Sequence, residues 1–234
     1  MIQFPSNALI IPWDEEQDIV IASDNSGSIG EKKLDDIYVP YDTVSYFAFR
    51  VAYMDCIANG GVPYTIVLQN FNDKSAWENL LKGIEKGVKE TGINPLPITG
   101  STETNFILQQ SATCLTMIGK KVRTEVTQNM APLKTAVIGK PLVGKEVLTK
   151  KTSVAPLSLF QWFSLCKEVI ALIPVGSIGI AATFDRAGLE IPVSIKEHLS
   201  VYTSSGPSTC FIIVYQHSFH DVIKEKAKHL FFGE

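Results

Sequence analysis

Residues 19–71 read IVIASDNSGSIGEKKLDDIYVPYDTVSYFAFRVAYMDCIANGGVPYTIVLQNF, and this segment decides the fold. It begins as a β-branched strand that ends in Asp24, and it continues into a loop rich in Gly and Ser with two lysines. A predicted helix that carries Asp55 and a further strand follow. A shorter segment, 98–106 (ITGSTETNF), repeats the plan of a strand end, a turn of small residues and an acid, here Glu103. Hard divalent cations prefer carboxylates at such positions, and small-residue loops offer backbone N–H groups to phosphates.

The helix in this segment is predicted from about Asp42, which can cap it, to the stop at residues 59–61 (NGG). Its apolar face consists of Val44, Phe47, Ala48, Val51, Met54 and Ala58. Asp55 falls on the same face at helical spacing, and a carboxylate that points inward is costly unless something pairs with it. A structural alternative stays open, in which a basic or hydroxyl neighbour such as Arg50 is the partner of Asp55.

The rest of the chain mixes strand hairpins with strand–helix–strand units. Strands are predicted at residues 8–12, 63–70, 95–99, 107–122, 134–139 and 209–215. Helices are predicted after a capping box at residues 75–78, from Pro156 onward and over residues 218–230. This mixture favours an α+β fold. The polar segment 141–153 is the best boundary, so we expect a larger N-terminal domain at 1–140 and a smaller C-terminal domain at 141–234.

Composition restricts the classes of partner. The 234 residues are 45% hydrophobic and 19% charged, with a net charge of −3. This balance is typical of a globular protein, and it argues against a broad nucleic-acid or anionic-membrane surface. The N-terminus shows no signal peptide, and the longest apolar run is too short and interrupted to span a bilayer. The four cysteines lack a C-x-x-C pair and are expected to be reduced thiols in a cytoplasmic protein.

Each motif also has a plain structural interpretation that stays open. The loop SDNSGSIGEKK (23–33) is neither a Walker A motif nor a Rossmann fingerprint, so a surface hairpin loop is as good an interpretation as a phosphate cradle. Asp24 is also a common turn residue, and segments 100–105 and 204–208 can be simple polar turns. Taken together, acids, glycines and hydroxyls at successive strand ends predict a metal–phosphate site.

The order of these motifs resembles the aminoimidazole-ribotide synthetase (PurM-like) superfamily, which includes thiamine-monophosphate kinase and selenophosphate synthetase. Members carry a strand end D-G-V-G-T-K, a helix with N-D-x-x-x-x-G-A-x-P, and a turn G-G-E-T or G-G-D-T. The corresponding segments here are DNSG (24–27), MDCIANGGVP (54–63) and GSTETN (100–105). The resemblance covers nearly the whole chain.

The branch that the sequence resembles most is that of the α-ribazole kinase-like proteins of cobalamin salvage. The similarity lies in segments 23–30, 100–106, 174–180 (PVGSIGI) and 204–209 (SSGPST). Two departures are visible. Ser28 stands where the branch prefers glycine, and PVGS (174–177) stands where the synthetase carries a D-x-S-G-G acid.

The resemblance implies a fold and a site. The N-terminal α/β domain would form an intersubunit β-barrel in a homodimer, with a smaller C-terminal α/β domain after it. ATP and Mg²⁺ would be the cofactors, and the partner would be a small-molecule substrate rather than nucleic acid or membrane. The implied metal ligands are Asp24, Asp55 and Glu103. The implied nucleotide-binding residues are Gly27, Gly30, Gly100, Ser101, Thr102, Asn105 and Gly206. Asp24 and Lys32 would be catalytic, with Lys33 as an alternative to Lys32 and with Asp36 and Asp42 as further metal candidates.

Three functions follow from the resemblance. The leading hypothesis is an ATP-dependent kinase that phosphorylates the 5′-hydroxyl of α-ribazole. A second is another PurM-like enzyme whose acceptor is thiamine monophosphate or an amide oxygen. A third is a degenerate member that binds a nucleotide or dimerises without turnover.

Overall fold

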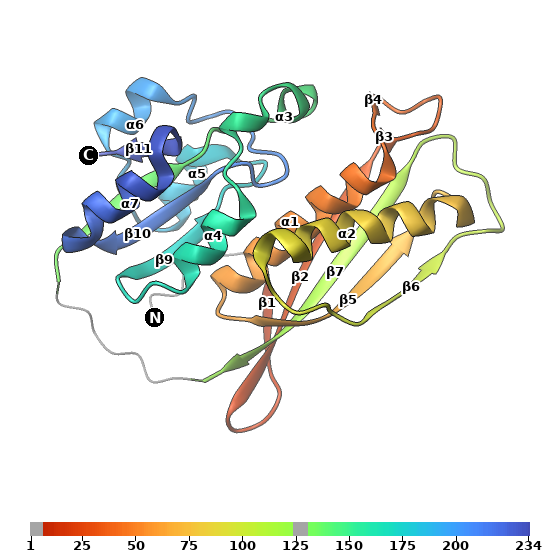
Figure 1. The fold of residues 1–234 in the computed structure, drawn as a ribbon, viewed down its shortest axis with the longest axis horizontal. Helices are drawn as coiled ribbons and strands as arrows, with labels where there is room; N and C mark the ends of the chain where they lie inside the picture. Colours follow the sequence, from red (N-terminus) through yellow and green to blue (C-terminus); the bar gives the residue numbers. More distant parts are fainter. Residues whose placement is uncertain (1–6, 124–130) are drawn as a thin grey trace. The chain divides into compact units, whose positions relative to one another are not determined.

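The computed structural model describes residues 7–123 and 131–234, and these form two compact units. The first unit holds residues 7–123, and the second holds residues 131–234. Each unit is built around its own β-sheet (Figure 1). The expected mixture of helices and strands is confirmed.

The first unit is organised around a five-stranded sheet with the order β1-β2-β7-β5-β6. Its strands are β1 (Leu9–Pro12), β2 (Gln17–Gly27), β5 (Val62–Asn70), β6 (Ile98–Thr102) and β7 (Ala112–Val122). Neighbouring strands are antiparallel except for β5 and β6, which are parallel. The loop after β2 contains a small parallel pair, β3 (Ile29–Gly30) and β4 (Ile37–Tyr38).

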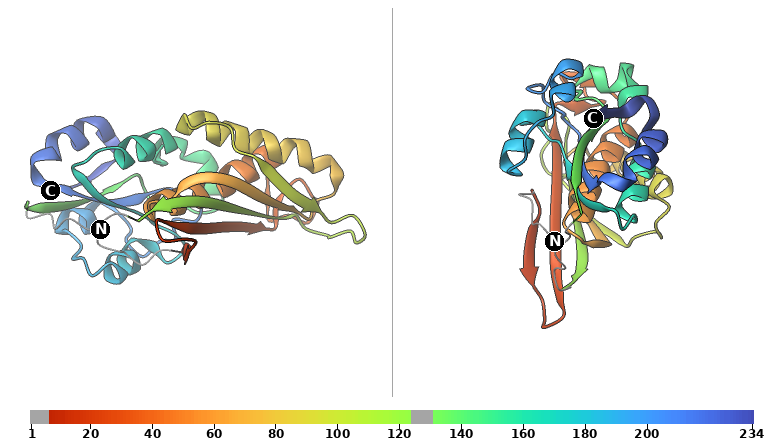
Figure 2. Two further views of the ribbon diagram at one scale, coloured as in Figure 1. Left: turned by 90° about the horizontal axis from the view of Figure 1, so that it is seen from below. Right: turned by 90° about the vertical axis from the view of Figure 1, so that its left-hand side faces the viewer.

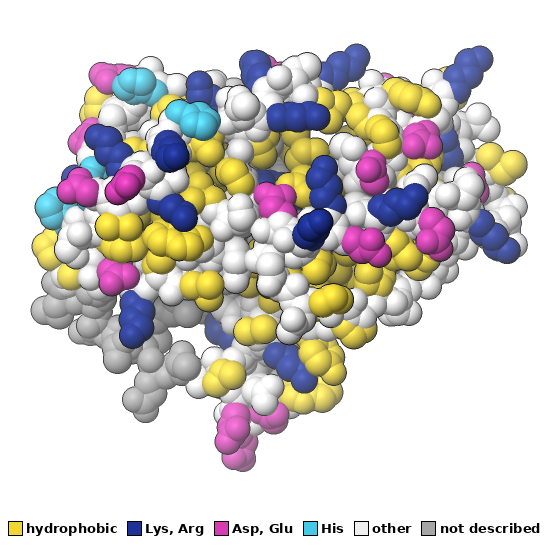
Figure 3. Space-filling model, viewed as in Figure 1, with side chains coloured by type: hydrophobic (Ala, Val, Ile, Leu, Met, Phe, Trp, Pro, Cys, Tyr) yellow, Lys and Arg dark blue, Asp and Glu magenta, His cyan; other side chains and the backbone are white. Residues whose placement is uncertain are grey.

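Helices α1 (Tyr41–Ala58) and α2 (Trp77–Thr91) cover one face of this sheet (Figure 2). Alternate residues of β2 point toward them, and Val20 and Ala22 are fully buried there. The two helices approach closely because α2 has glycines at the crossing. A Cβ at Gly83 would lie 2.0 Å from the Asp42 carbonyl oxygen, and one at Gly87 would lie 2.2 Å from the Phe49 ring. The outer face of α2 carries interspersed Lys and Glu side chains, as a solvated helix face does (Figure 3).

The second unit contains an antiparallel four-stranded sheet with the order β11-β8-β10-β9. Its strands are β8 (Leu133–Ile138), β9 (Val169–Pro174), β10 (Phe211–Gln216) and β11 (Phe231–Gly233). Its helices are α3 (Lys145–Thr149), α4 (Leu157–Ser164), α5 (Gly179–Arg186), α6 (Val193–His198) and α7 (His220–Ala227). Residues 211–215 of β10 are all buried, so both faces of the sheet are covered.

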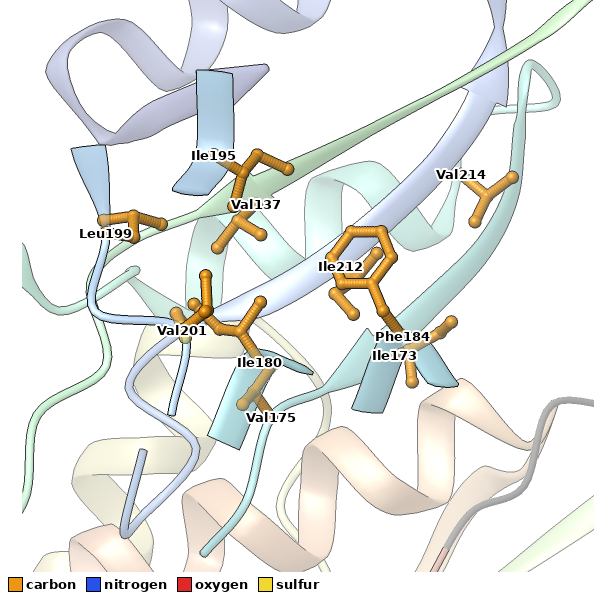
Figure 4. Packing of buried hydrophobic residues seen from close by; sticks show 11 residues of the cluster. Val137, Ile173, Val175, Ile180, Phe184, Ile195, Leu199, Val201, Ile212 and Val214 are labelled. Carbon is orange, nitrogen blue, oxygen red and sulfur yellow. The ribbon is translucent and has the colours of Figure 1, made fainter. Parts of the chain in front are cut away.

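Two apolar layers flank β10. On one face Ile212 and Val214 pack in a cluster with Ile180 and Phe184 of α5 (Figure 4). On the other face Phe211 meets the ring of Phe160 from α4 edge-on, with ring centroids 4.9 Å apart. Burial of two aromatic rings of this size stabilises the unit by a few kcal/mol, which is about 1.5–3 kcal/mol per large side chain.

Several predicted boundaries were wrong. Strand β8 was expected in a domain ending at residue 140, but it pairs with β10 and β11 of the second unit, so the chain enters the second sheet at Leu133. Its partners follow more than 70 residues later, and no local pattern shows which sheet it joins. The strand predicted at 107–122 starts only at Ala112. Ser75 does not cap α2: Asp73 caps the 3-10 turn Lys74–Ala76 that precedes the helix, since its carboxylate accepts a hydrogen bond of 2.7 Å from the Ser75 N–H.

All four cysteines are unpaired. Cys56 and Cys210 are fully buried, and burial raises the pKa of the Cys56 thiol to about 12. Within residues 7–123 and 131–234, no helix combines the length and apolar character that crossing a bilayer requires.

Candidate functional site

Strand ends and helix starts of the first unit meet at one edge of its sheet. Strands β2, β5 and β6 run in the same direction and end there, and β7 begins there. Helix α1 also starts at this edge, because the Tyr41 hydroxyl lies 3.1 Å from Ser111 Oγ, directly before β7. Helix α2 starts beside Gly100 of β6, which Trp77 contacts. We call this the strand-end edge. Helix N-termini carry partial positive charge, so the edge favours anions.

Two acids lie on the helix-facing side of the sheet, Asp24 on β2 near the strand-end edge and Asp55 near the C-terminal end of α1, away from that edge. Asp24 follows Val20 and Ala22 on the helix-facing side of β2 and is half-buried. The pKa of Asp24 is raised to about 7, chiefly by burial; the Asn25 N–H lowers this pKa, and the charge of Asp55 raises it. Asp55 lies on the α1 stripe with Val51, as predicted, and is 4% exposed. Burial raises the pKa of Asp55 to about 7 as well. An acid that is buried near another acid disfavours its own ionised form.

The structure does not pair Asp55 with Arg50. The Arg50 guanidinium is fully buried and interacts with Tyr46, whose hydroxyl donates a 2.6 Å hydrogen bond to Glu90. Within the described ranges, no cationic side chain lowers the pKa of Asp24 or Asp55. A basic partner for Asp55 is therefore not found among the described residues, and the hydroxyl partner that the sequence left open stays a prediction. Two acids without a counter-charge have the donor set that a hard cation takes.

A polar row crosses the sheet near the strand-end edge. Ser26 lies opposite Thr113, Thr113 lies opposite Asn70, and Asn70 lies opposite Thr102. The Asn70 amide donates to Thr102 Oγ1 at 3.2 Å. Ser26 Oγ is buried and has no hydrogen-bond partner among the described residues. A buried hydroxyl that is left unmatched fits a polar ligand atom.

Sequence reasoning missed the amides of this edge. The Asn72 side chain donates to Thr113 Oγ1 at 2.8 Å and accepts from the Ala112 N–H at 2.8 Å. Asn70 and Asn72 are each 1% exposed. The signal that could have found them is the spacing N-x-N directly after an apolar strand, because amides there satisfy the turn's backbone groups.

Glu103 does not join the two acids. Across the sheet, Asp24 of β2 pairs with Leu115 of β7, and Leu115 pairs with Leu68 of β5. Leu68 in turn pairs with Gly100 of β6. Three strand spacings, about 14 Å, therefore separate β2 from β6. The Glu103 carboxylate accepts from the N–H groups of Asn105 and Phe106, which lowers its pKa. No three His, Cys, Asp or Glu residues in the described ranges are placed to hold a metal ion together. Of the three predicted acids, Asp24 and Asp55 interact electrostatically and Glu103 lies apart from them, while the role of these acids as metal ligands stays a prediction.

The predicted nucleotide-binding glycines have different surroundings. Gly27 is open, since a Cβ there would have no atom within 4 Å. Gly30 and Gly100 are so closely packed that neighbouring atoms leave no room for a Cβ. A Cβ at Gly30 would lie 2.4 Å from Ser111 Oγ, and one at Gly100 would lie 1.9 Å from the Leu68 carbonyl oxygen. Gly206 belongs to the second unit, where a Cβ would lie 3.3 Å from Val143.

The other predicted residues lie at or near the strand-end edge. Ser101 and Asn105 are exposed, while Thr102 and Lys32 are engaged in hydrogen bonds. Lys33 is exposed. Asp36 donates its N–H to the Ser28 carbonyl, and Asp42 lies in the first turn of α1. Neither Asp36 nor Asp42 forms a metal-ligating cluster of three within the part of the chain that the structure describes.

Ser28 → Gly is expected to raise the free energy of unfolding by about 0.5–1 kcal/mol. Ser28 has a φ of 59°, a left-handed conformation that glycine adopts at lower cost. Urea denaturation measures the effect, and Ser28 → Ala is the control because it keeps the strained Cβ. Equal stability of the glycine and alanine variants would show that the backbone is not strained at this position.

Solved structures that are similar to this chain confirm the fold that the motifs predict. No model of a known protein family matches the sequence, and no curated protein sequence matches it. Among solved structures, it is similar to T. maritima PurL complexed with ADP, with 15% identity and a TM-score of 0.59 over 99% of this chain and 41% of that chain.

Two further solved structures share the fold. The hydrogenase maturation protein HypE in complex with ATP has 12% identity and a TM-score of 0.56, over 91% of this chain and 72% of that chain. The thiamine monophosphate kinase of Aquifex aeolicus has 13% identity and a TM-score of 0.54, over 91% and 83%. At these identities the likeness concerns the fold.

Proposed function

We propose that this protein is an ATP-dependent kinase that transfers a phosphoryl group to a hydroxyl of a small molecule. The observation that carries the proposal is the pair of buried acids, Asp24 and Asp55, which have no counter-charge in a unit whose strand-end edge gathers two helix N-termini. The fold supports it, because PurL and HypE have been solved with ADP and ATP and because thiamine monophosphate kinase shares the fold.

The residues present fit a magnesium–nucleotide ligand. Asp24 and Asp55 would hold Mg²⁺, which when bound neutralises charge on the phosphates. The open Gly27 backbone and the unmatched Ser26 hydroxyl would hold phosphate oxygens. Positioning and charge neutralisation are most of what phosphoryl transfer requires. Asp24 is therefore also the leading catalytic candidate.

The acceptor is proposed from the motifs. Segments 23–30, 100–106, 174–180 and 204–209 resemble the α-ribazole kinase-like branch, so we propose the 5′-hydroxyl of α-ribazole. Coupled ADP release with α-ribazole, other nucleosides and thiamine monophosphate tests this. ADP release with α-ribazole alone supports the proposal, and release with thiamine monophosphate instead assigns the second hypothesis.

A binding protein without turnover is the competing function. It is favoured by the missing third acid beside Asp24 and Asp55 among the described residues. Calorimetric titration with ATP, with and without Mg²⁺, separates the two. Magnesium-dependent ATP binding followed by ADP release with an acceptor supports the kinase. Nucleotide binding with no release for any acceptor in the panel would replace the kinase by the binding protein.

A homodimer is expected to form through the face of the first sheet that α1 and α2 leave uncovered. Leu9 lies opposite Ile21, which lies opposite Ile118, and Leu9 is 58% exposed. Because an apolar sheet face is unfavourable in water, pairing with a second copy would bury it. Ile21 → Lys should convert the dimer into a monomer in sedimentation at micromolar concentration. Leu165 → Lys, in the second unit, is the control that should stay dimeric, and a compact monomer of the parental protein would contradict the prediction.

A further inference from the structure

The side chain of Lys32 donates hydrogen bonds to backbone carbonyls. Its Nζ lies 2.9 Å from the Leu108 oxygen, 3.3 Å from the Phe71 oxygen and 3.4 Å from the Gln110 oxygen. These carbonyls belong to two other segments, the turn after β5 and the loop between β6 and β7. A lysine ammonium has three donors, and three acceptors engage all of them.

Asp35 ties the same loop to the start of β7. Its Oδ1 accepts from the Ser111 N–H at 2.6 Å, and its Oδ2 accepts from Ser111 Oγ at 2.6 Å and from the Lys32 N–H at 2.8 Å. These hydrogen bonds and the charge of Lys32 outweigh desolvation and lower the pKa of Asp35. Hydrogen bonds to an ionised carboxylate are about twice as strong as neutral ones.

Ser111 connects this network to α1. Because its hydroxyl proton is donated to Asp35, its Oγ accepts from the Tyr41 hydroxyl, 3.1 Å away. Its carbonyl accepts from the Ser28 N–H at 2.8 Å, and the residue is 1% exposed. Gly30 lets the loop lie directly over Ser111 and Tyr41, since a Cβ would overlap both.

We infer that Lys32, Asp35, Ser111 and Tyr41 form a clasp that holds the 28–36 loop in one arrangement against β7 and α1. Lys32 is thus a positioning residue, and it reaches the nucleotide only through the backbone that it holds. This assignment rests on the proposed function for its effect on nucleotide binding. The clasp itself is a property of the nucleotide-free protein. A loop held before the ligand arrives loses less conformational entropy on binding, which increases affinity.

The test compares Lys32 → Met with Lys33 → Met, the exposed neighbour, as the matched control. Hydrogen exchange on nucleotide-free protein is the first readout. The amides of residues 103–111 should exchange at least several-fold faster in Lys32 → Met and at the parental rate in Lys33 → Met. Gln110 → Ala removes only the 2.7 Å hydrogen bond to the Leu34 carbonyl, so it should give a smaller change in the same direction. If Lys32 → Met fails to fold, the exchange of residues 103–111 in Gln110 → Ala is the test of the clasp instead.

Nucleotide affinity is the second readout. Lys32 → Met should weaken Mg²⁺–ADP and Mg²⁺–AMPPCP binding equally, by about tenfold, because the loop and not the γ-phosphate has lost its support. Unchanged exchange in residues 103–111 would overturn the clasp. Selective loss of AMPPCP affinity would also overturn the positioning role, because it would show that Lys32 contacts the terminal phosphate. If the parental protein binds neither nucleotide, the proposed function fails, and the exchange experiment still decides whether the clasp exists.

Discussion

Asp55 → Asn is expected to keep or raise the melting temperature while turnover falls by a factor on the order of a hundred or more. Asp55 is 4% exposed, and burial raises its pKa to about 7. An amide of the same shape removes the cost of a buried charge. It also removes a carboxylate from the pair proposed to bind Mg²⁺, and charge neutralisation dominates phosphoryl transfer. Thermal unfolding and ADP release, measured on the same protein, separate the two effects.

The stability gain of this variant should grow with pH. The pKa of Asp55 rises from an ordinary value of 3.8 to about 7 on folding. Between these values the folded protein holds a proton that the unfolded chain has lost, so the stability of the parental protein falls as pH rises from 4 to 7. The Asp55 → Asn protein has no carboxyl group at this position, so its stability does not fall with pH in this way. We expect the two proteins to be similar at pH 4 and to differ by on the order of 4 kcal/mol at pH 8 without Mg²⁺.

Asp42 → Asn is the matched control on the same helix. Asp42 lies in the first turn of α1 and outside the acid pair, so its variant should keep turnover near the parental rate. Loss of turnover in both variants would instead make Asp42 part of the site. An Asp55 → Asn protein that melts normally and still turns over ATP near the parental rate would remove the metal role. It would also weaken the functional assignment, because Asp55 belongs to the most specific motif.

The sequence predicted best what depends on local periodicity. Helix α1 and the inward position of Asp55 follow from a stripe at helical spacing over 18 residues, and both are confirmed. The strand partners of β8 could not be predicted, because they lie at residues 211–216 and 231–233, far along the chain. The sequence of a short strand does not indicate which distant strand it pairs with.

The same limit explains why the candidate site could be predicted only in part. Asp24 and Asp55 were predicted together because each lies on a face that local pattern defines. Glu103 follows a strand whose place in the sheet depends on the insertion of β7 and β5 between β2 and β6. Sequence order alone would place the three strand ends side by side. The clasp was missed for the same reason, since Asp35 and Ser111 are separated by 76 positions.

Two predicted nucleotide-binding glycines are expected to behave in opposite ways. Gly100 → Ala should lower the free energy of unfolding by roughly 3 kcal/mol, because its Cβ would lie 1.9 Å from the Leu68 carbonyl oxygen and 3.0 Å from the Trp77 ring. Leu68 pairs with Gly100 between β5 and β6, so a methyl group can be accommodated only if the strands separate. A backbone oxygen, unlike the end of a flexible side chain, cannot move aside alone.

Gly27 → Ala is the matched variant, and its stability should stay within about 0.5 kcal/mol of the parental value, since no atom lies within 4 Å of the added Cβ. If the Gly27 backbone approaches a phosphate, the methyl group obstructs that approach, and Mg²⁺–ATP affinity should fall at least about tenfold. Urea denaturation and calorimetry on both variants give the two quantities. A Gly100 → Ala protein that is stable but has lost nucleotide affinity would show that Gly100 belongs to the nucleotide-binding site. A Gly27 → Ala protein with parental affinity would place the phosphates away from the end of β2.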